Sequence, residues 1–270
     1  MVNRKLRFNL KETRFLNNTE IDEIWNVYSG HHNATFSQFM DRTFNQFGYM
    51  AICRDAQTQK IVGFTGIRIA NIQLKSGKDA TAIYFGQTFI RSEYRGCNLL
   101  KFCAIQIGLK CKLTNPFKPS YIWFDAISYK PYLLLSKYSG ECYPSIDREM
   151  PEDIKKLIDT LGYRYYPNQY NPNNGTVIKT CHRLRDNDTR IHNYDLNNQY
   201  IRFYAEKNPG HTRGDGLICV LPNTFYNYFI ILRKVVSKSL SKRLSAVAEN
   251  STSFFPINKV MKYFLQRANS

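Results

Sequence analysis

The sequence predicts an α/β domain with a mixed, mostly antiparallel central sheet flanked by helices, followed by a C-terminal helical extension. β-prone segments and segments of helical periodicity alternate along the first half of the chain. Turn residues at 55–59 and 75–79 join consecutive strands, which predicts antiparallel hairpins. From 223 onward, apolar residues are interleaved with Lys and Arg. We therefore expect one large domain over 1–222 and a basic amphipathic extension over 223–270.

The first part of the chain is expected to form one strand, then two helices and then three strands. Asn17 and its neighbours offer N-cap side chains for the first helix, and Gly48 is expected to end the second. The predicted elements, in order, are a strand at 5–16, helices at 20–28 and 36–47, and strands at 49–54, 60–73 and from 81 onward.

The stretch 84–109 predicts a strand, a polar turn over 91–98 and a helix from Leu99 onward. A turn that opens a helix presents unpaired backbone N–H groups at the positive end of the helix dipole, where phosphate groups bind. Arg91 and Arg95 add positive charge beside that turn. These residues predict an anion site.

Glu93-Tyr94-Arg95-Gly96 and the strand before it resemble motif A of the GNAT N-acetyltransferase superfamily, and the order of predicted elements matches the start of that fold. In that family the amides of this turn bind the pyrophosphate of acetyl-CoA. Asn98 stands where a second glycine is usual, and Leu100 stands where a small residue is usual. The resemblance implies these cofactor-binding residues: Phe89, Ile90, Arg91, Arg95, Gly96, Cys97, Asn98, Leu99 and Leu100.

A buried strand at 121–127 and a helix at 128–138 follow. In the family this strand parallels the motif A strand, the two splay apart, and the acyl-CoA arm lies between them. The family's acidic Tyr aligns with Leu135, so Tyr132 or Tyr138 is the candidate acid for the leaving thiolate. Asp125 is the candidate base, because burial would raise its pKa; the alternative is a structural carboxylate bonded to a neighbouring backbone group or Arg.

The rest of the domain is less regular. We expect a helix at 151–161 ended by Gly162, a loop at 163–175, a strand at 176–184, short strands at 200–205 and 217–221, and a glycine-rich connection at 208–216.

The composition bears on partners and compartment. A net charge of +17 predicts an anionic partner. Seven cysteines without CxxC or metal spacing predict reduced thiols and no metal site. Cys97, at a helix N-terminus, is interpreted as an incidental thiol and not a nucleophile. With no apolar leader and no membrane-length apolar run, the expected location is the cytoplasm, either free or peripheral to a membrane.

These features predict an N-acyltransferase that moves an acyl group directly from acetyl-CoA, a longer acyl-CoA or an acidic acyl carrier protein to an amine. The alternatives are a catalytically inactive GNAT-like binding or scaffold protein and, less favoured, a nucleic-acid-binding protein. His31 and His32 are expected in an exposed loop beside the acceptor site.

The extension is expected to be helical over 223–248. Its apolar stripe, namely Phe225, Phe229, Leu232 and Val236, is predicted to pack on the domain, and its basic residues to associate weakly with anionic membrane surfaces.

Overall fold

An eight-stranded sheet forms the centre of the computed structural model, in the order β1-β2-β3-β4-β5-β8-β7-β6. The structure describes residues 5–74, 76–94, 97, 99–183, 190–234 and 237. Neighbouring strands pair antiparallel except β4 and β5, which run parallel. The expected fold class is therefore confirmed. The strands are β1 (Leu6–Glu12), β2 (Tyr49–Asp55), β3 (Ile61–Gln73), β4 (Asp79–Ile90), β5 (Ser120–Ala126), β6 (Tyr170–Asn171), β7 (Thr176–Val177) and β8 (Gly216–Pro222).

Helices cover both faces of this sheet. The α-helices are α1 (Asn18–His31), α2 (Phe36–Gln46), α3 (Leu99–Cys103), α4 (Lys110–Thr114), α5 (Tyr129–Tyr138), α6 (Glu152–Tyr165) and α7 (Gln199–Lys207). A π-helical segment, η3 (Ala104–Leu109), joins α3 to α4 without a break, and short 3-10 turns are η1 (Thr13–Phe15), η2 (Ser92–Tyr94), η5 (Asn193–Asn197) and η6 (His211–Arg213). Reciprocal capping boxes start α1 at Asn17 and α2 at Thr35.

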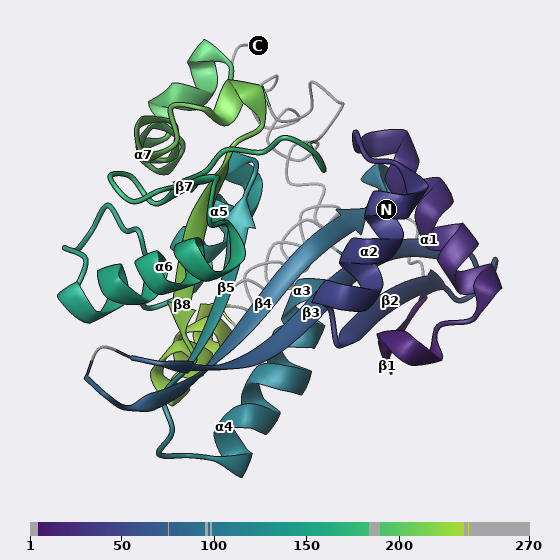
Figure 1. Cartoon of the computed structure of the whole chain (residues 1–270), viewed down its shortest axis with the longest axis horizontal. Coiled ribbons are helices and arrows are strands. Elements are labelled where there is room, and N and C mark those ends of the chain that lie inside the picture. The colour runs from purple at the N-terminus through teal and green to yellow at the C-terminus, as the bar shows by residue number, and fades with distance from the viewer. Residues whose placement is uncertain are drawn as a thin grey trace, which may run out of the picture.

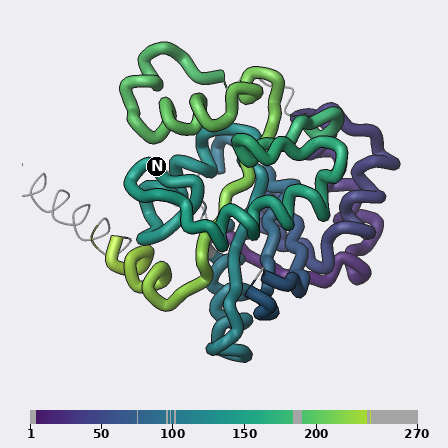
Figure 2. Tube along the Cα trace, turned by 60° about the vertical axis from the view of Figure 1, so that its left-hand side comes forward, coloured from purple at the N-terminus to yellow at the C-terminus, as the bar shows by residue number. Residues whose placement is uncertain are grey.

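Strand alternation decides which helices meet which face. Met50 and Ile52 of β2 pack with α1 and α2, whereas Ala51 and Cys53 pack with α3. Figure 1 shows α1 and α2 over the first strands and α6 over the other half of the sheet. α7 packs with α5 against Leu217 and Cys219 of β8, on the face opposite to the one that α6 covers. Figure 2 shows the same division from the side.

The two halves of the sheet part at the junction of β4 and β5. Their parallel pairing runs from Thr81↔Ser120 to Tyr84↔Trp123 and extends no further. Beyond it β4 continues to pair with β3, and β5 continues to pair with β8. Figure 1 shows the two strands diverging from this point. We call this divergence the fork.

The helix that follows β8, over 225–234, docks through polar contacts and not through its apolar stripe. Phe225 is 52% exposed, and Phe229 and Leu232 are each 62% exposed. The predicted packing of that stripe is therefore wrong for these three residues, and Val236 lies outside the described residues. Instead, Asn227 is buried: its side-chain oxygen accepts from the amides of Gly140 and Glu141, and its nitrogen donates to the carbonyls of Glu141 and Pro222.

The other anchor is Tyr228, which uses the π-helical segment. A π-helix disturbs the regular ladder and leaves carbonyls available to other donors. The Tyr228 hydroxyl donates to the carbonyl of Ala104 (3.1 Å), and Asn223 donates to that of Gly108 (2.8 Å). A Cβ at Gly108 would collide with the Tyr228 hydroxyl, so the close approach of the two helices requires glycine there.

The docked side of this helix can be tested with Asn227→Ala. Removing a buried amide that satisfies four backbone groups should lower the free energy of unfolding by about 2–4 kcal/mol, because each orphaned buried group costs about 1–3 kcal/mol. Phe229→Ala on the same helix is the matched control and should stay within about 0.5 kcal/mol of wild type. Urea unfolding measures both. A larger loss for Phe229→Ala would show that the stripe packs after all.

Candidate active site at the fork

A buried polar network lies where the fork opens. The Tyr84 hydroxyl of β4 donates to Oδ1 of Asp125 on β5, and Lys179, just after β7, pairs with Oδ2. The side chains of Asp125 and Lys179 are each 6% exposed. Because these residues come from both sides of the divergence, the network ties the two halves of the sheet together.

Further side chains complete the network. Nη2 of Arg42, on α2, donates to the Tyr84 hydroxyl (3.1 Å), and the hydroxyls of Tyr84 and Tyr166 lie 3.2 Å apart. The Lys179 ammonium lies 4.3 Å from the centroid of the Tyr166 ring. The Arg68 guanidinium lies 3.6 Å from the Tyr165 ring centroid and 4.7 Å from that of Tyr84. Aromatic faces thus stabilise cations that a single carboxylate could not balance.

The state of Asp125 corrects one expectation. Burial does raise the pKa of this carboxyl, but the charges of Lys179 and Arg42 outweigh burial and hold its pKa below the ordinary value. Asp125 is therefore an ionised, paired carboxylate, and it is not a base whose pKa has been raised toward neutrality. Burial, and then the neighbouring Asp125 charge, raises the pKa of Tyr84, which stays a neutral donor.

A bulge in β4 lies next to this network. The register with β3 passes from Gly66↔Gly86 to Phe64↔Phe89, so that Gln87 and Thr88 face Thr65 alone. Gln87 has a φ of 48°, in the left-handed region. Its side-chain oxygen accepts from Thr43 of α2 (3.1 Å), while its buried amide nitrogen has no hydrogen-bond partner among the described residues. The bulge leaves a donor free beside the fork.

A contact between a tyrosine and a histidine links α1 to the segment after β7. The Tyr28 hydroxyl and Nδ1 of His182 lie 2.8 Å apart, and burial followed by the charges of Arg42 and Lys179 lowers the pKa of His182 to about 3. His32 is buried and stacks on Tyr28 with 4.0 Å between ring centroids. The expectation of an exposed histidine loop is therefore wrong, since α1 extends through His31.

The predicted cofactor-binding residues lie at the open end of β4 and the start of α3. Phe89 and Ile90 end β4, and the Phe89 ring stacks on His31. The Arg91 amide donates to Val62, and its Nε donates to Ile61. Leu99 is fully buried and Leu100 is half-buried. Arg95, Gly96 and Asn98 lie outside the described residues.

Cys97 precedes α3 and lies against Cys53 of β2. A hydrogen bond from Cys53 lowers the pKa of Cys97 to about 7, although burial opposes it, and the Leu99 amide adds to the lowering. The half-buried thiol is therefore more acidic than an ordinary cysteine, chiefly because of its hydrogen bond with Cys53. Its acidity makes the interpretation of Cys97 as a bystander open to test.

The two candidate acids on α5 have different surroundings. Tyr132 is 1% exposed and packs against Phe203 and Tyr204 of α7. Burial raises its pKa, so it behaves as a core residue. Tyr138 ends α5 and is half-buried. Sequence reasoning missed Tyr84, Tyr166, Arg42, Lys179 and His182; the one available signal was the cluster of Tyr and Lys around an isolated buried-strand Asp.

The sequence and the fold were compared with those of known proteins. No protein-family profile matches, and no curated protein matches in sequence. An acetyltransferase of Trypanosoma brucei is 16% identical with a TM-score of 0.36, over 55% of this chain and 99% of that one. A predicted acetyltransferase of Clostridium acetobutylicum, solved with acetyl-CoA, is 13% identical with a TM-score of 0.38, over 55% and 93%.

An N-myristoyltransferase of Saccharomyces cerevisiae with bound myristoyl-CoA is 11% identical with a TM-score of 0.36, over 63% of this chain and 47% of that one. Several other similar structures are GNAT-family acetyltransferases. At these identities and TM-scores the overlaps assign no activity. The strand order and the fork match the arrangement that the sequence resemblance implied.

The ion pair makes a prediction about acid stability. A carboxyl whose pKa is lowered on folding stabilises the protein above its unfolded pKa, and that stability is lost as the pH falls through the folded pKa. Asp125→Asn should therefore cost about 3–5 kcal/mol at pH 7, because it leaves Lys179 buried without a counter-ion. The difference from wild type should shrink as the pH falls below the ordinary value of 3.8. Urea unfolding from pH 7 to pH 3 measures it; a constant difference would contradict the lowered pKa.

Proposed function

We propose that this protein transfers an acyl group from acetyl-CoA or a longer acyl-CoA directly to an amine. The observation that carries the proposal is the fork: two parallel strands part after Tyr84 and Trp123, with the β4 bulge on one side and the Asp125 network on the other. The start of α3, beyond the end of β4, supplies amides for the pyrophosphate. An acyl carrier protein is the other donor that the positive charge would suit.

Because Asp125 is ionised with a lowered pKa, the protons that it can accept in the reaction are limited. An alkylammonium has a pKa of about 10.4, and each pKa unit is about 1.36 kcal/mol. Moving its proton to a carboxyl whose pKa lies below 3.8 therefore costs about 9 kcal/mol or more. The amine must accordingly arrive neutral, and Asp125 acts later, on the far more acidic N–H of the adduct.

The proposed reaction then balances as follows. The amine nitrogen attacks the thioester carbonyl carbon, and the N–H proton of the adduct passes to Asp125. The carbon–sulfur bond breaks, and the CoA thiolate takes a proton from Tyr138, because the Tyr132 hydroxyl is enclosed by α5 and α7. The buried Gln87 amide nitrogen, which has no partner among the described residues, would donate to the thioester carbonyl oxygen.

Binding of CoA is tested with Gly96→Asp. A carboxylate in the turn repels the pyrophosphate, so calorimetry should show binding by wild type and loss of about tenfold or more in the variant. Gly48→Asp is the matched control, since it adds the same charge at a glycine with open space around it. Equal affinity in wild type and Gly96→Asp would refute the assignment of the turn.

Turnover is tested by comparing Asp125→Asn with Cys97→Ser. Direct transfer predicts that the Asp125 variant loses about 10²-fold or more in kcat, the usual worth of a positioned proton acceptor, while the Cys97 variant keeps most activity. Circular dichroism must first show that the Asn variant is folded at the assay temperature. The opposite ranking would indicate a covalent acyl-cysteine route. CoA binding without turnover on any amine tried would identify the protein as an inactive binding relative.

A further inference from the structure

We infer that the face formed by η3, α4 and the helix at 225–234 binds an anionic lipid bilayer. This surface, here called the apolar-basic face, lies on the side of the molecule opposite to α1 and α2 (Figure 1). The inference is independent of acyl transfer, and three observations carry it: exposed apolar side chains, their arrangement in adjoining stripes, and the charge around them.

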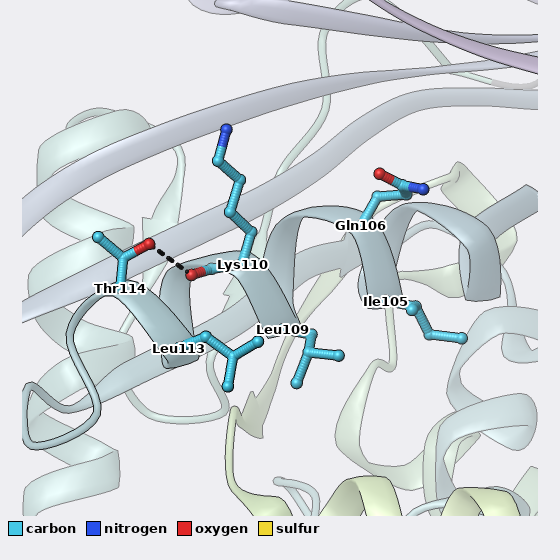
Figure 3. Close-up of a pocket in the computed structure, with 6 residues that line it drawn as sticks. All are labelled: Ile105, Gln106, Leu109, Lys110, Leu113 and Thr114. Carbon is cyan, nitrogen blue, oxygen red and sulfur yellow. Dashed lines mark hydrogen bonds between the residues drawn. The ribbon is translucent and has the colours of Figure 1, made fainter.

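The first stripe belongs to η3 and α4. Ile105 is 53% exposed and Leu113 is 63% exposed. Together with Leu109 they line a shallow open groove. Figure 3 shows Ile105, Leu109 and Leu113 on one side of the helix and Gln106 and Lys110 on the other. Phe117, in the loop after α4, is 97% exposed.

The second stripe belongs to the helix at 225–234. It consists of Phe225, Phe229 and Leu232, which point away from the contacts made by Asn227. Tyr226 beside them is 53% exposed. These large aromatic and aliphatic side chains are left exposed by the described part of the domain.

The two stripes adjoin each other. Tyr228 contacts the π-helical segment η3 at Ala104 and Gly108. Phe225 and Leu232 lie one helical turn from Tyr228, and Ile105 lies one turn before Gly108. Both views place the two helices side by side (Figures 1 and 2). The exposed apolar residues therefore form one composite surface, larger than either helix alone would present.

Charge selects the partner. The segments 94–124 and 216–248 contain no Asp or Glu. Their basic residues are Arg95, Lys101, Lys110, Lys112, Lys118, Arg233, Lys234, Lys238, Lys242 and Arg243. Among these, Lys110, Arg233 and Lys234 are exposed. Lys110 lies on the other side of its helix from the first stripe (Figure 3), and the Lys234 ammonium donates to the carbonyls of Lys137 and Ser139. Exposed bulky apolar residues in segments with an excess of cations and no acidic residue suit the boundary between headgroups and acyl chains of an anionic bilayer. Within the described part of the chain no helix is long and apolar enough to cross a membrane, so the contact is a peripheral one.

Co-sedimentation of the full chain with vesicles tests the inference. Phosphatidylcholine vesicles with about 30% phosphatidylserine should bind the protein at low salt, and pure phosphatidylcholine should bind it at least tenfold more weakly. Binding to the anionic vesicles should weaken steeply as salt is raised. Equal binding to both vesicle types, or no binding even at low salt, would overturn the proposal. The second result would indicate that an acidic protein or the segment 238–270 covers this face.

Matched variants locate the contact. The double variant Phe229→Ser, Leu232→Ser should bind anionic vesicles about tenfold or more weakly, because each burial of such a side chain is worth about tenfold. Phe15→Ser is the control: Phe15 is 63% exposed, like Phe229, but lies on η1 beside β1. Unchanged thermal unfolding of the double variant separates lost binding from lost folding. An equal loss in the Phe15 variant would show that binding is not located on this face.

Discussion

The buried pair of Asp125 and Lys179 is the interaction on which the arrangement around the fork depends. Where parallel strands part, their edges lose backbone partners, and the side chains between them must hold the two halves together. Asp125 does this from β5 by accepting from Tyr84 of β4 and pairing with Lys179 beyond β7. Such a pair adds little net stability, but losing one partner costs far more, because the other charge stays buried.

Three of the chain's 19 tyrosines surround that pair. Tyr84, Tyr166 and Tyr165 provide hydroxyl donors and ring faces to the cations that enter this region. The charges of Lys179 and Arg42 hold the pKa of Asp125 below its ordinary value, against the effect of burial. Burial, followed by the same two charges, lowers the pKa of His182. The same feature that stabilises the fork therefore fixes the protonation states available to its chemistry.

Predictions of helices and strands from local sequence were wrong at positions where contacts with residues elsewhere in the chain determine the local structure. Gly162 was expected to end a helix, yet α6 continues to Tyr165. Gly162 instead gives room for the ring of Tyr170, with which any side chain there would collide. The strand predicted at 176–184 ends at Val177, since Lys179 turns to meet Asp125. Residues 200–205 were expected to form a strand, but they are helical in α7, which Asn198 caps and which packs on Tyr132.

The sequence by itself determined the order of the first strands and helices and the helix after β8. Those features follow from capping residues, hairpin turns and apolar periodicity, which act over a few residues. The parallel pair that opens the fork was expected only from the family resemblance. Only the tertiary structure decided that Asp125 is ionised and paired, that Tyr132 belongs to the core, and that Phe225, Phe229 and Leu232 face outward. Periodicity reveals that a helix has an apolar stripe, but the side that docks depends on partners such as Gly108 and Gly140, which lie far away in the chain.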